Sequence, residues 1–234
     1  MCLKQFDIVI LISAKTEWSE VKKHFPNVTL NKSPFGEFFS DQITKRMSML
    51  FFQSGWGKIP AASSTQYVID KCNPKLLINI GTCGGFEDCI EQGTIILANE
   101  TIVYDIIEQM GDQNEAIKHF STKIDLNWYD EKYPIEVKEY KLLSGDRDII
   151  PSDIHLLKDK YNAIAADWES GAIAFVANLN NVKCLILRGV SDLVGKKSGE
   201  AYDGQLIIYK KRTKLIIDKL IKSLPHWICK INIL

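Results

Sequence analysis

The sequence predicts an α/β protein whose sheet is covered by helices on both faces. Short apolar runs rich in β-branched residues, at residues 8–14, 75–80 and 183–190, have the length and composition of buried parallel strands. Segments with helical periodicity lie between such runs, and this alternation is typical of α/β sheets. Small and polar residues follow several of the strands, at the end of the sheet where α/β proteins bind their ligands.

The first elements follow from local signals. The strand at residues 8–14 leads into a helix that we expect Thr16 to cap and Pro26 to close. Residues 35–40 and 47–53 then predict two antiparallel strands around a polar turn.

Glycine marks the next two boundaries. A glycine-rich turn at residues 54–58 opens a helix over about 60–71. The buried strand at 75–80 ends in Gly81-Thr82-Cys83-Gly84-Gly85, which we interpret as a turn. Residues 93–97 and 100–104 predict two further strands.

The second half begins with a polar, aromatic stretch, residues 111–134, that has no clear period. We expect it to be a long excursion that serves as a lid over a site or as a subunit contact. Periodicity and apolar content predict the remaining elements, which are strands at 139–144, 163–167 and 183–190 and helices at 152–159, 169–179 and about 204–224.

The composition is that of an ordinary globular protein, and we expect one domain over residues 1–234. Lys plus Arg equals Asp plus Glu at 29 each, so no basic surplus indicates a nucleic-acid or membrane partner. The apolar run at 8–12 is too short to span a bilayer, and no signal-peptide pattern surrounds it. The six cysteines form no CxxC pair and have no zinc-ligand spacing with the four scattered histidines. We therefore expect free thiols, a cytoplasmic location, and no metal or cofactor.

Three acidic residues are expected at strand exits: Glu17, Glu169 and Asp192. Each alone also has a simpler interpretation, as a solvated first-turn glutamate, a helix-terminus acid and an Asx turn, respectively. The run from Thr82 to Gly85 is likewise either a mere turn or a place where Gly84 lets the backbone approach a ligand closely.

Together, the three acids match the requirements of N-glycosidic bond cleavage. A purine leaves readily only when a ring nitrogen is protonated, which requires an acid. The sugar develops oxocarbenium character, which hydrogen bonds to its hydroxyls stabilise, and an attacking water needs a base. Asp192 suits the acid role, because a carboxyl group at the exit of a buried strand can have a raised pKa.

Five short motifs carry a family resemblance: SGWGK at 54–58, NIGTCGGF at 79–86, SGD at 144–146, DWESGAIA at 167–174 and RGVSD at 188–192. In this order and spacing, they resemble the purine nucleoside phosphorylase superfamily, and within it the methylthioadenosine/S-adenosylhomocysteine nucleosidases. The resemblance extends over about residues 8–220. It implies a three-layer α/β/α domain with a central twisted mixed sheet, a small purine nucleoside as substrate, and a homo-oligomer, with a dimer favoured.

The resemblance also implies residue roles. Asp192 is expected to protonate the purine N7, with Ser191 helping to hold it. Glu169 is expected to bind the ribose hydroxyls, with Trp168 beside the sugar and Asp167 next to them in the motif.

The remaining roles concern the attacking water and the nucleoside. Thr82 is expected near the sugar and the water, Glu17 as the base for that water, and Arg188 close to it. Aligning Glu17 with the family's glutamate requires a gap in the loop before it. Trp56 stands near the nucleoside, where the family has a smaller aliphatic residue.

The choice between water and phosphate depends on the phosphate-binding residues. Related hexameric phosphorylases carry a Gly-Asp-Pro-x-Arg loop after the first strand, whereas this loop reads Ser-Ala-Lys-Thr-Glu, and Asn79 stands in the later strand where they have an arginine. Without an arginine clamp, phosphate would be held poorly, so we expect hydrolysis. Lys15 can bind phosphate as a point charge, which keeps a phosphorylase as the alternative.

A third alternative is a catalytically silent nucleoside-binding protein, against which the intact Glu169 and Asp192 argue. Asp148, preceded by Arg147, stands where the family has a phenylalanine that stacks on the base. The base and 5′ pockets have therefore been rebuilt, and the sequence does not identify the nucleoside.

Overall fold

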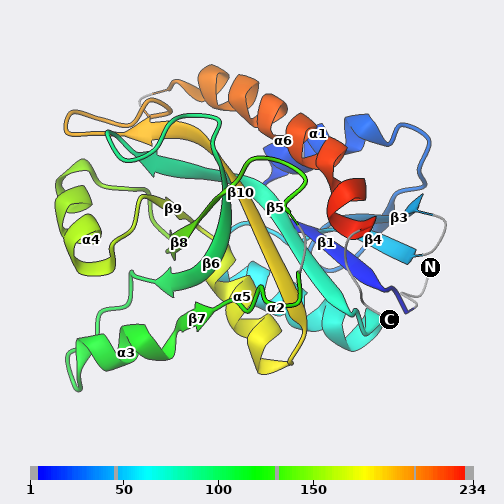
Figure 1. The fold of residues 1–234 in the computed structure, drawn as a ribbon, viewed down its shortest axis with the longest axis horizontal. Helices are drawn as coiled ribbons and strands as arrows, with labels where there is room; N and C mark the ends of the chain where they lie inside the picture. The colour runs from blue at the N-terminus through cyan, green and yellow to red at the C-terminus, as the bar shows by residue number, and fades with distance from the viewer. Residues whose placement is uncertain (1–4, 45–46, 130–131, 203, 230–234) are drawn as a thin grey trace.

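A computed structural model describes residues 5–44, 47–129, 132–202 and 204–229 (Figure 1). Its centre is a ten-stranded mixed sheet in the order β10-β6-β8-β9-β5-β1-β4-β3-β2, with β7 paired to β6. The strands are β1 (Ile8–Ile12), β2 (Asn31–Lys32), β3 (Glu37–Thr44), β4 (Met47–Gln53), β5 (Leu76–Phe86), β6 (Ile95–Val103), β7 (Ser121–Lys123), β8 (Lys138–Ser144), β9 (Ala165–Asp167) and β10 (Lys183–Val194).

Five of the strands form a closed circuit. β5 pairs with β9, β9 with β8, β8 with β6, and β6 with β10, which returns to pair in parallel with β5. Each strand of this circuit is therefore hydrogen-bonded on both sides.

Helices cover both faces of the sheet, as predicted. Figure 1 shows α1 (Lys15–His24) and α6 (Leu206–Cys229) on one face, with α2 (Lys58–Cys72) and α5 (Ser170–Leu179) on the other. The shorter helices α3 (Gln113–His119) and α4 (Ile154–Tyr161) lie to one side, and the 3₁₀ turn η1 (Pro151–Asp153) precedes α4. Among the described residues, no helix combines the length and apolar content that a membrane span requires.

Strand β1 explains why its sequence is apolar throughout. Ile8, Ile10 and Ile12 belong to the core beneath α1 and α6, whereas Val9 and Leu11 belong to the core beneath α2 and α5. Alternate side chains of a strand point to opposite faces, so a central strand covered on both sides has no solvent-facing position. This burial confirms the predicted α/β/α class.

Two motifs that we interpreted as lying at strand ends instead lie within strands. The segment from Gly81 to Gly85 is part of β5, where Gly84 pairs with Ala166 of β9. Ser191 and Asp192 are part of β10, at a register shift opposite β5. Pairing between distant segments extends both strands beyond their apolar runs, and this overrides the local turn signal.

Two further expectations were wrong in detail. The two strands predicted at residues 93–97 and 100–104 are one strand, β6, which runs from Ile95 to Val103 and has an irregularity between Ala98 and Glu100. Ala14, not Thr16, is the N-cap of α1. Its backbone N–H donates to the Glu17 side chain, so Glu17 satisfies the helix end from within the first turn.

The stretch 111–134 is not an aperiodic excursion. It contains α3, which Asp112 caps through its side chain, and β7, which pairs with β6. None of its described residues lines the main cavity, so the expectation of a lid is wrong for the part of the stretch that the structure describes.

Candidate active site

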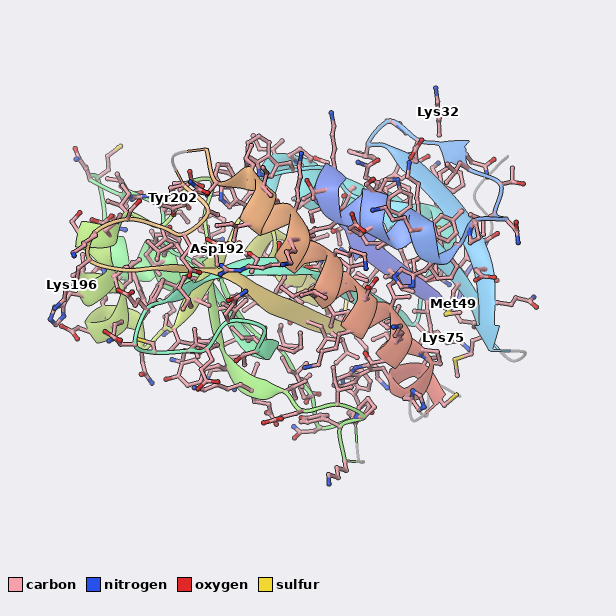
Figure 2. All side chains as sticks on the ribbon, turned by 90° about the horizontal axis from the view of Figure 1, so that it is seen from above. Lys32, Met49, Lys75, Asp192, Lys196 and Tyr202 are labelled. Atoms are coloured by element: carbon pink, nitrogen blue, oxygen red, sulfur yellow. The ribbon has the colours of Figure 1, made fainter. Side chains whose placement is uncertain are left out.

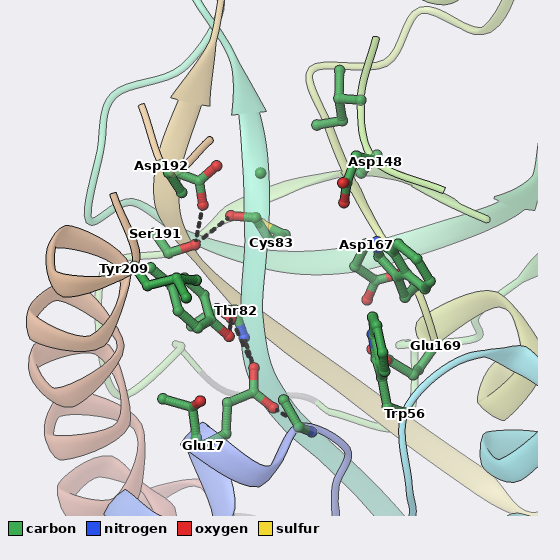
Figure 3. Close-up of a pocket in the computed structure, with 18 of the residues that line it drawn as sticks. Glu17, Trp56, Thr82, Cys83, Asp148, Asp167, Glu169, Ser191, Asp192 and Tyr209 are labelled. Atoms are coloured by element: carbon green, nitrogen blue, oxygen red, sulfur yellow. Dashed lines mark hydrogen bonds between the residues drawn. The ribbon is translucent and has the colours of Figure 1, made fainter. Parts of the chain in front are cut away.

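A cavity of about 620 Å³ lies where β1, β5 and β10 meet the start of α6 (Figure 3). Figure 2 shows Asp192 and Tyr202 beside the beginning of α6, far from Lys32, Met49 and Lys75 at the other end of the molecule. The cavity brings together nearly all the predicted site residues, which are Glu17, Trp56, Thr82, Gly84, Asp167, Trp168, Glu169, Ser191 and Asp192. Arg188 does not line it and lies behind its wall.

Glu17 is fixed at the base of the cavity. Its Oε1 atom accepts hydrogen bonds from the backbone N–H of Thr82 at 2.6 Å and from the Thr82 hydroxyl at 2.8 Å. Its Oε2 atom accepts from the backbone N–H of Ala14 at 3.1 Å. The side chain is buried, so the interpretation as a solvated first-turn glutamate is wrong.

Gly81 allows this close approach. A Cβ atom at this position would lie 2.8 Å from Glu17 Oε1 and 2.1 Å from Nη1 of Arg188. Any larger residue would displace the carboxylate or the guanidinium.

Arg188 is fully buried and joins three carboxylates. Its Nε atom lies 2.9 Å from Asp167, its Nη2 atom 3.6 Å from Glu169, and its Nη1 atom 3.9 Å from Glu17. Burial alone would lower the pKa of Arg188, but the three carboxylates raise it overall. One guanidinium thus faces three acidic groups in a region of low polarity.

The surplus of acidic groups in this cluster affects Glu169. This residue is the N-cap of α5, although we had expected it in the first helical turn. Burial raises the pKa of Glu169, Arg188 opposes the rise, and the charges of Asp167 and Glu17 add to it, which leaves the pKa at about 8. The Glu169 side chain also accepts a hydrogen bond from the backbone N–H of Gly57 at 3.1 Å. Glu169 therefore holds its proton more tightly than an ordinary glutamate.

Asp167 supports the start of the same helix. It accepts from the backbone N–H of Ser170 at 3.1 Å and from the Ser170 hydroxyl, and Arg188 also donates to that hydroxyl. The DWES motif therefore anchors α5 to the buried arginine and presents Glu169 to the cavity.

Asp192 faces the cavity from β10. The Ser191 hydroxyl donates to Asp192 Oδ1 at 2.6 Å and also lies 3.2 Å from the carbonyl oxygen of Cys83. Burial raises the pKa of Asp192 and the Ser191 hydrogen bond opposes the rise. Because Asp192 belongs to a strand, the Asx-turn interpretation is wrong.

Two tryptophans form another wall. The rings of Trp56 and Trp168 stack with centroids 4.9 Å apart at 30°. Trp56 is 67% exposed despite its size, so one face of the stack remains open at the mouth of the cavity.

Several lining residues were not found from the sequence. Tyr209 of α6 brings its hydroxyl to 3.4 Å from the Thr82 hydroxyl, and Tyr202 donates to the carbonyl oxygen of Ile149 at 2.8 Å. Neither tyrosine belongs to a motif, so no local signal distinguished them from ordinary aromatic residues. Lys15, Arg147 and Asp148, which were singled out from the sequence, also line the cavity.

No metal site is evident in the part of the chain that the structure describes, since no three His, Cys, Asp or Glu side chains there form a suitable cluster. The cavity instead combines a carboxyl group with a raised pKa, Asp192, with a hydrogen-bonded carboxylate, Glu17. Such a pair can donate a proton to one part of a ligand and accept one from another.

The sequence is similar to known proteins over most of its length. The model of the phosphorylase superfamily matches residues 7–222. The chain is 29% identical over 206 residues to a 5′-methylthioadenosine/S-adenosylhomocysteine nucleosidase of Staphylococcus haemolyticus, which covers 80% of this chain and 87% of that protein. An enzyme of the same name from Psychromonas ingrahamii is 26% identical over 200 residues, covering 80% and 86%.

Solved structures share the fold. The Campylobacter jejuni 5′-methylthioadenosine/S-adenosylhomocysteine nucleosidase matches with a TM-score of 0.77 at 19% identity, covering 94% of this chain and 99% of that one. The futalosine hydrolase of Helicobacter pylori matches with a TM-score of 0.77 at 18% identity, covering 97% and 99%. With its family model matched over residues 7–222, the chain belongs to the phosphorylase superfamily.

Proposed function

We propose that the protein hydrolyses the N-glycosidic bond of a purine nucleoside and releases the free base and the sugar. One observation carries the proposal: Asp192, an acid with a raised pKa, and Glu17, a buried carboxylate, occupy different walls of one cavity (Figure 3). Two carboxyl groups in unlike environments are the arrangement that acid and base roles require.

The reaction divides the work among three carboxyl groups. Asp192 gives its proton to N7 of the purine while the bond between C1′ and N9 breaks and its electron pair passes to the base. Glu169 binds the ribose hydroxyls as the sugar becomes cationic. Glu17 accepts a proton from water as the water oxygen bonds to C1′. Exchange with solvent then restores both carboxyl groups.

Water fits this site better than phosphate. The buried arginine already faces three carboxylates, so it has no charge to spare for a dianion. A phosphate placed to attack C1′ would also meet the carboxylate of Glu17. Lys15, at the cavity edge, is the cation that a phosphorylase would have to use.

Separation of reaction products tests the proposal. Purified protein is incubated with methylthioadenosine, S-adenosylhomocysteine, adenosine, inosine and guanosine, each with and without phosphate. We expect free base and free sugar without phosphate. Sugar 1-phosphate formed only with phosphate would establish the phosphorylase alternative. Ligand binding without any product would establish the silent binding protein.

The relatives named above act, by their names, on methylthioadenosine and S-adenosylhomocysteine. The base and 5′ group of the substrate are expected to differ in the present chain, because Trp56 and Asp148 line its cavity in place of the residues that the family resemblance implies.

We also propose that the protein is a homodimer, joined across the start of α2 and the segment after β6. Ile59, Ile107 and Met110 are exposed there, and an ion pair between Lys58 and Asp105 links the two segments. Replacing Ile59 and Ile107 with aspartate should convert a dimer to a monomer in light scattering. Leu215→Asp, at an exposed apolar position on α6, is the control and should leave the mass unchanged.

We propose a cytoplasmic location on the state of the thiols. The described cysteines, Cys72, Cys83, Cys89, Cys184 and Cys229, are all free, and Cys2 lies outside the described residues. Free thiols persist in reducing compartments. Fractionation of cells that express the protein should recover it with cytoplasmic markers.

A further inference from the structure

Asp148 is an acidic group that the proposed reaction does not use. It lies in the loop between β8 and η1, and Figure 3 shows its carboxylate on the opposite side of the cavity from Ser191 and Asp192. In the described part of the chain, it makes no hydrogen bond or ion pair. Its carboxylate is therefore available to a ligand.

The neighbours of Asp148 are held by other groups. Arg147 donates to Asp153 at 2.8 Å, so it does not neutralise Asp148. The carbonyl oxygen of Ile149 accepts the hydrogen bond from Tyr202 at 2.8 Å. Contacts on both sides therefore fix the loop, and the carboxylate is presented from a supported backbone.

The proposed reaction determines which edge of the base faces this wall. If Asp192 protonates N7, the five-membered ring lies against β10 and the six-membered ring extends across the cavity. Gly84 forms the floor between the walls: a Cβ atom there would lie 2.7 Å from Ile149 Cδ1 and 3.8 Å from Asp192 Oδ2. The ring edge that carries N1 and its neighbours therefore faces the Asp148 loop.

A carboxylate distinguishes purines by their donors, since it accepts hydrogen bonds and donates none. Guanine presents N1–H and the 2-amino group side by side, which matches the two oxygens of one carboxylate. Hypoxanthine presents N1–H alone. Adenine has an unprotonated N1, whose lone pair would face the negative charge. The order of preference expected from Asp148 is therefore guanine, then hypoxanthine, then adenine.

We infer that Asp148 selects nucleosides of 6-oxopurines, guanine above all, over those of adenine. The inference rests on the proposed function, because the orientation of the base comes from the role of Asp192. Asp148 is exposed in the cavity, so its unpaired carboxylate is solvated, and the preference comes from the hydrogen bonds that it accepts from the base. We expect kcat/KM for guanosine to exceed that for adenosine by about 10-fold or more.

The substitution Asp148→Asn tests the inference, because it replaces one of the two acceptor oxygens of the side chain with a hydrogen-bond donor. The asparagine amide can donate to N1 of adenine and accept from its 6-amino group, whereas it offers guanine one acceptor in place of two for the adjacent N1–H and 2-amino group. The kcat/KM values of the wild type and the variant are compared for guanosine, inosine and adenosine, which share one sugar. The same three bases are also tested as 5′-methylthio nucleosides. Asp159→Asn, an exposed change on α4 outside the cavity, is the matched control.

The expected result is a guanosine preference in the wild type and the control, and a ratio of guanosine to adenosine at least 10-fold lower in Asp148→Asn. A wild type that prefers adenine nucleosides, or a variant with an unchanged ratio, would overturn the inference while leaving the hydrolase proposal intact.

Calorimetric binding of the free bases separates this failure from failure of the proposed function. If no nucleoside is cleaved, the hydrolase proposal fails. The affinities for the free bases then test whether Asp148 selects guanine. Guanine bound more tightly than adenine, with the difference lost in Asp148→Asn, would support the inference. Equal binding of the two bases, or tighter binding of adenine, would overturn it.

Discussion

Thr82 donates two hydrogen bonds to the same oxygen of Glu17, one from its backbone N–H and one from its hydroxyl, at 2.6 and 2.8 Å. Both donors come from β5, whereas the carboxylate comes from α1, so the sheet determines where the proposed base points. Tyr209 approaches the same hydroxyl from α6 at 3.4 Å. Residues from α1, β5 and α6 thus meet around the Thr82 hydroxyl.

Removing the hydroxyl should weaken catalysis without unfolding the protein. Thr82→Val keeps the backbone N–H but removes a hydrogen bond to a charged group, which is worth about 1.5–3 kcal/mol. We expect kcat/KM to fall about 10- to 100-fold, and the melting temperature to fall by several degrees while the protein stays folded. Thr29→Val, an exposed change far from the cavity, is the control for both measurements. Activity within twofold of the wild type would argue against a role for this bond.

Asp192→Asn should lower kcat by a factor of about 100 or more, because the leaving purine loses its proton donor. The affinity for nucleoside, measured by calorimetry, should change much less. In the wild type, activity should fall as pH rises through the raised pKa of Asp192, since only the protonated form can donate. Unchanged turnover in Asp192→Asn would exclude the assignment of Asp192 as the acid.

Glu169 should make the folded state less stable as pH rises. Its pKa is about 8 in the folded protein, against an ordinary value of 4.5, so the folded state holds a proton that the unfolded chain releases. This contribution is complete below about pH 4.5 and is lost as pH rises to about 8, at up to about 1.4 kcal/mol per pH unit.

Urea unfolding at pH 5, 6, 7 and 8 measures this effect when the wild type is compared with Glu169→Gln. The variant should show a smaller decline in the free energy of unfolding over this range, because glutamine does not titrate. Parallel curves for the two proteins would mean that Glu169 titrates normally in the folded state.

Arg188→Met should destabilise the protein by about 3–5 kcal/mol, because removing one partner of a buried ion pair leaves the other charges uncompensated. Arg147→Met is a matched control, since Arg147 pairs with Asp153 near the surface and such pairs contribute at most about 1 kcal/mol. Urea unfolding at one pH measures both changes. Similar losses in the two variants would show that the buried cluster has no special importance for stability.

The layers of the fold were predictable because the central strands are covered on both faces, and such strands are apolar throughout. The position of Glu17, Glu169 and Asp192 in one cavity was also predictable, since each follows or extends a strand at the same end of the sheet. These predictions required only the order of strands and helices along the chain.

The extent of β5 and β10 was not predictable from local signals. Gly84 and Asp192 remain in strands because β9 and the neighbouring part of the circuit supply hydrogen-bond partners from far along the chain. The role of Tyr209 was hidden for a similar reason. The periodicity of α6 indicates which side packs on the sheet, but not that its first turns reach the cavity.

The closed circuit of strands has a consequence for the energetics of ligand binding. Thr82 and Asp192 lie on β5 and β10, and these two strands pair with each other at both positions, Thr82 with Gly189 and Asp192 with Gly84. A ligand that enters the cavity does not have to order these strands, and little of its affinity is lost to conformational entropy there. Amide hydrogen exchange at Thr82 and Asp192 should accordingly be slow even in the empty enzyme.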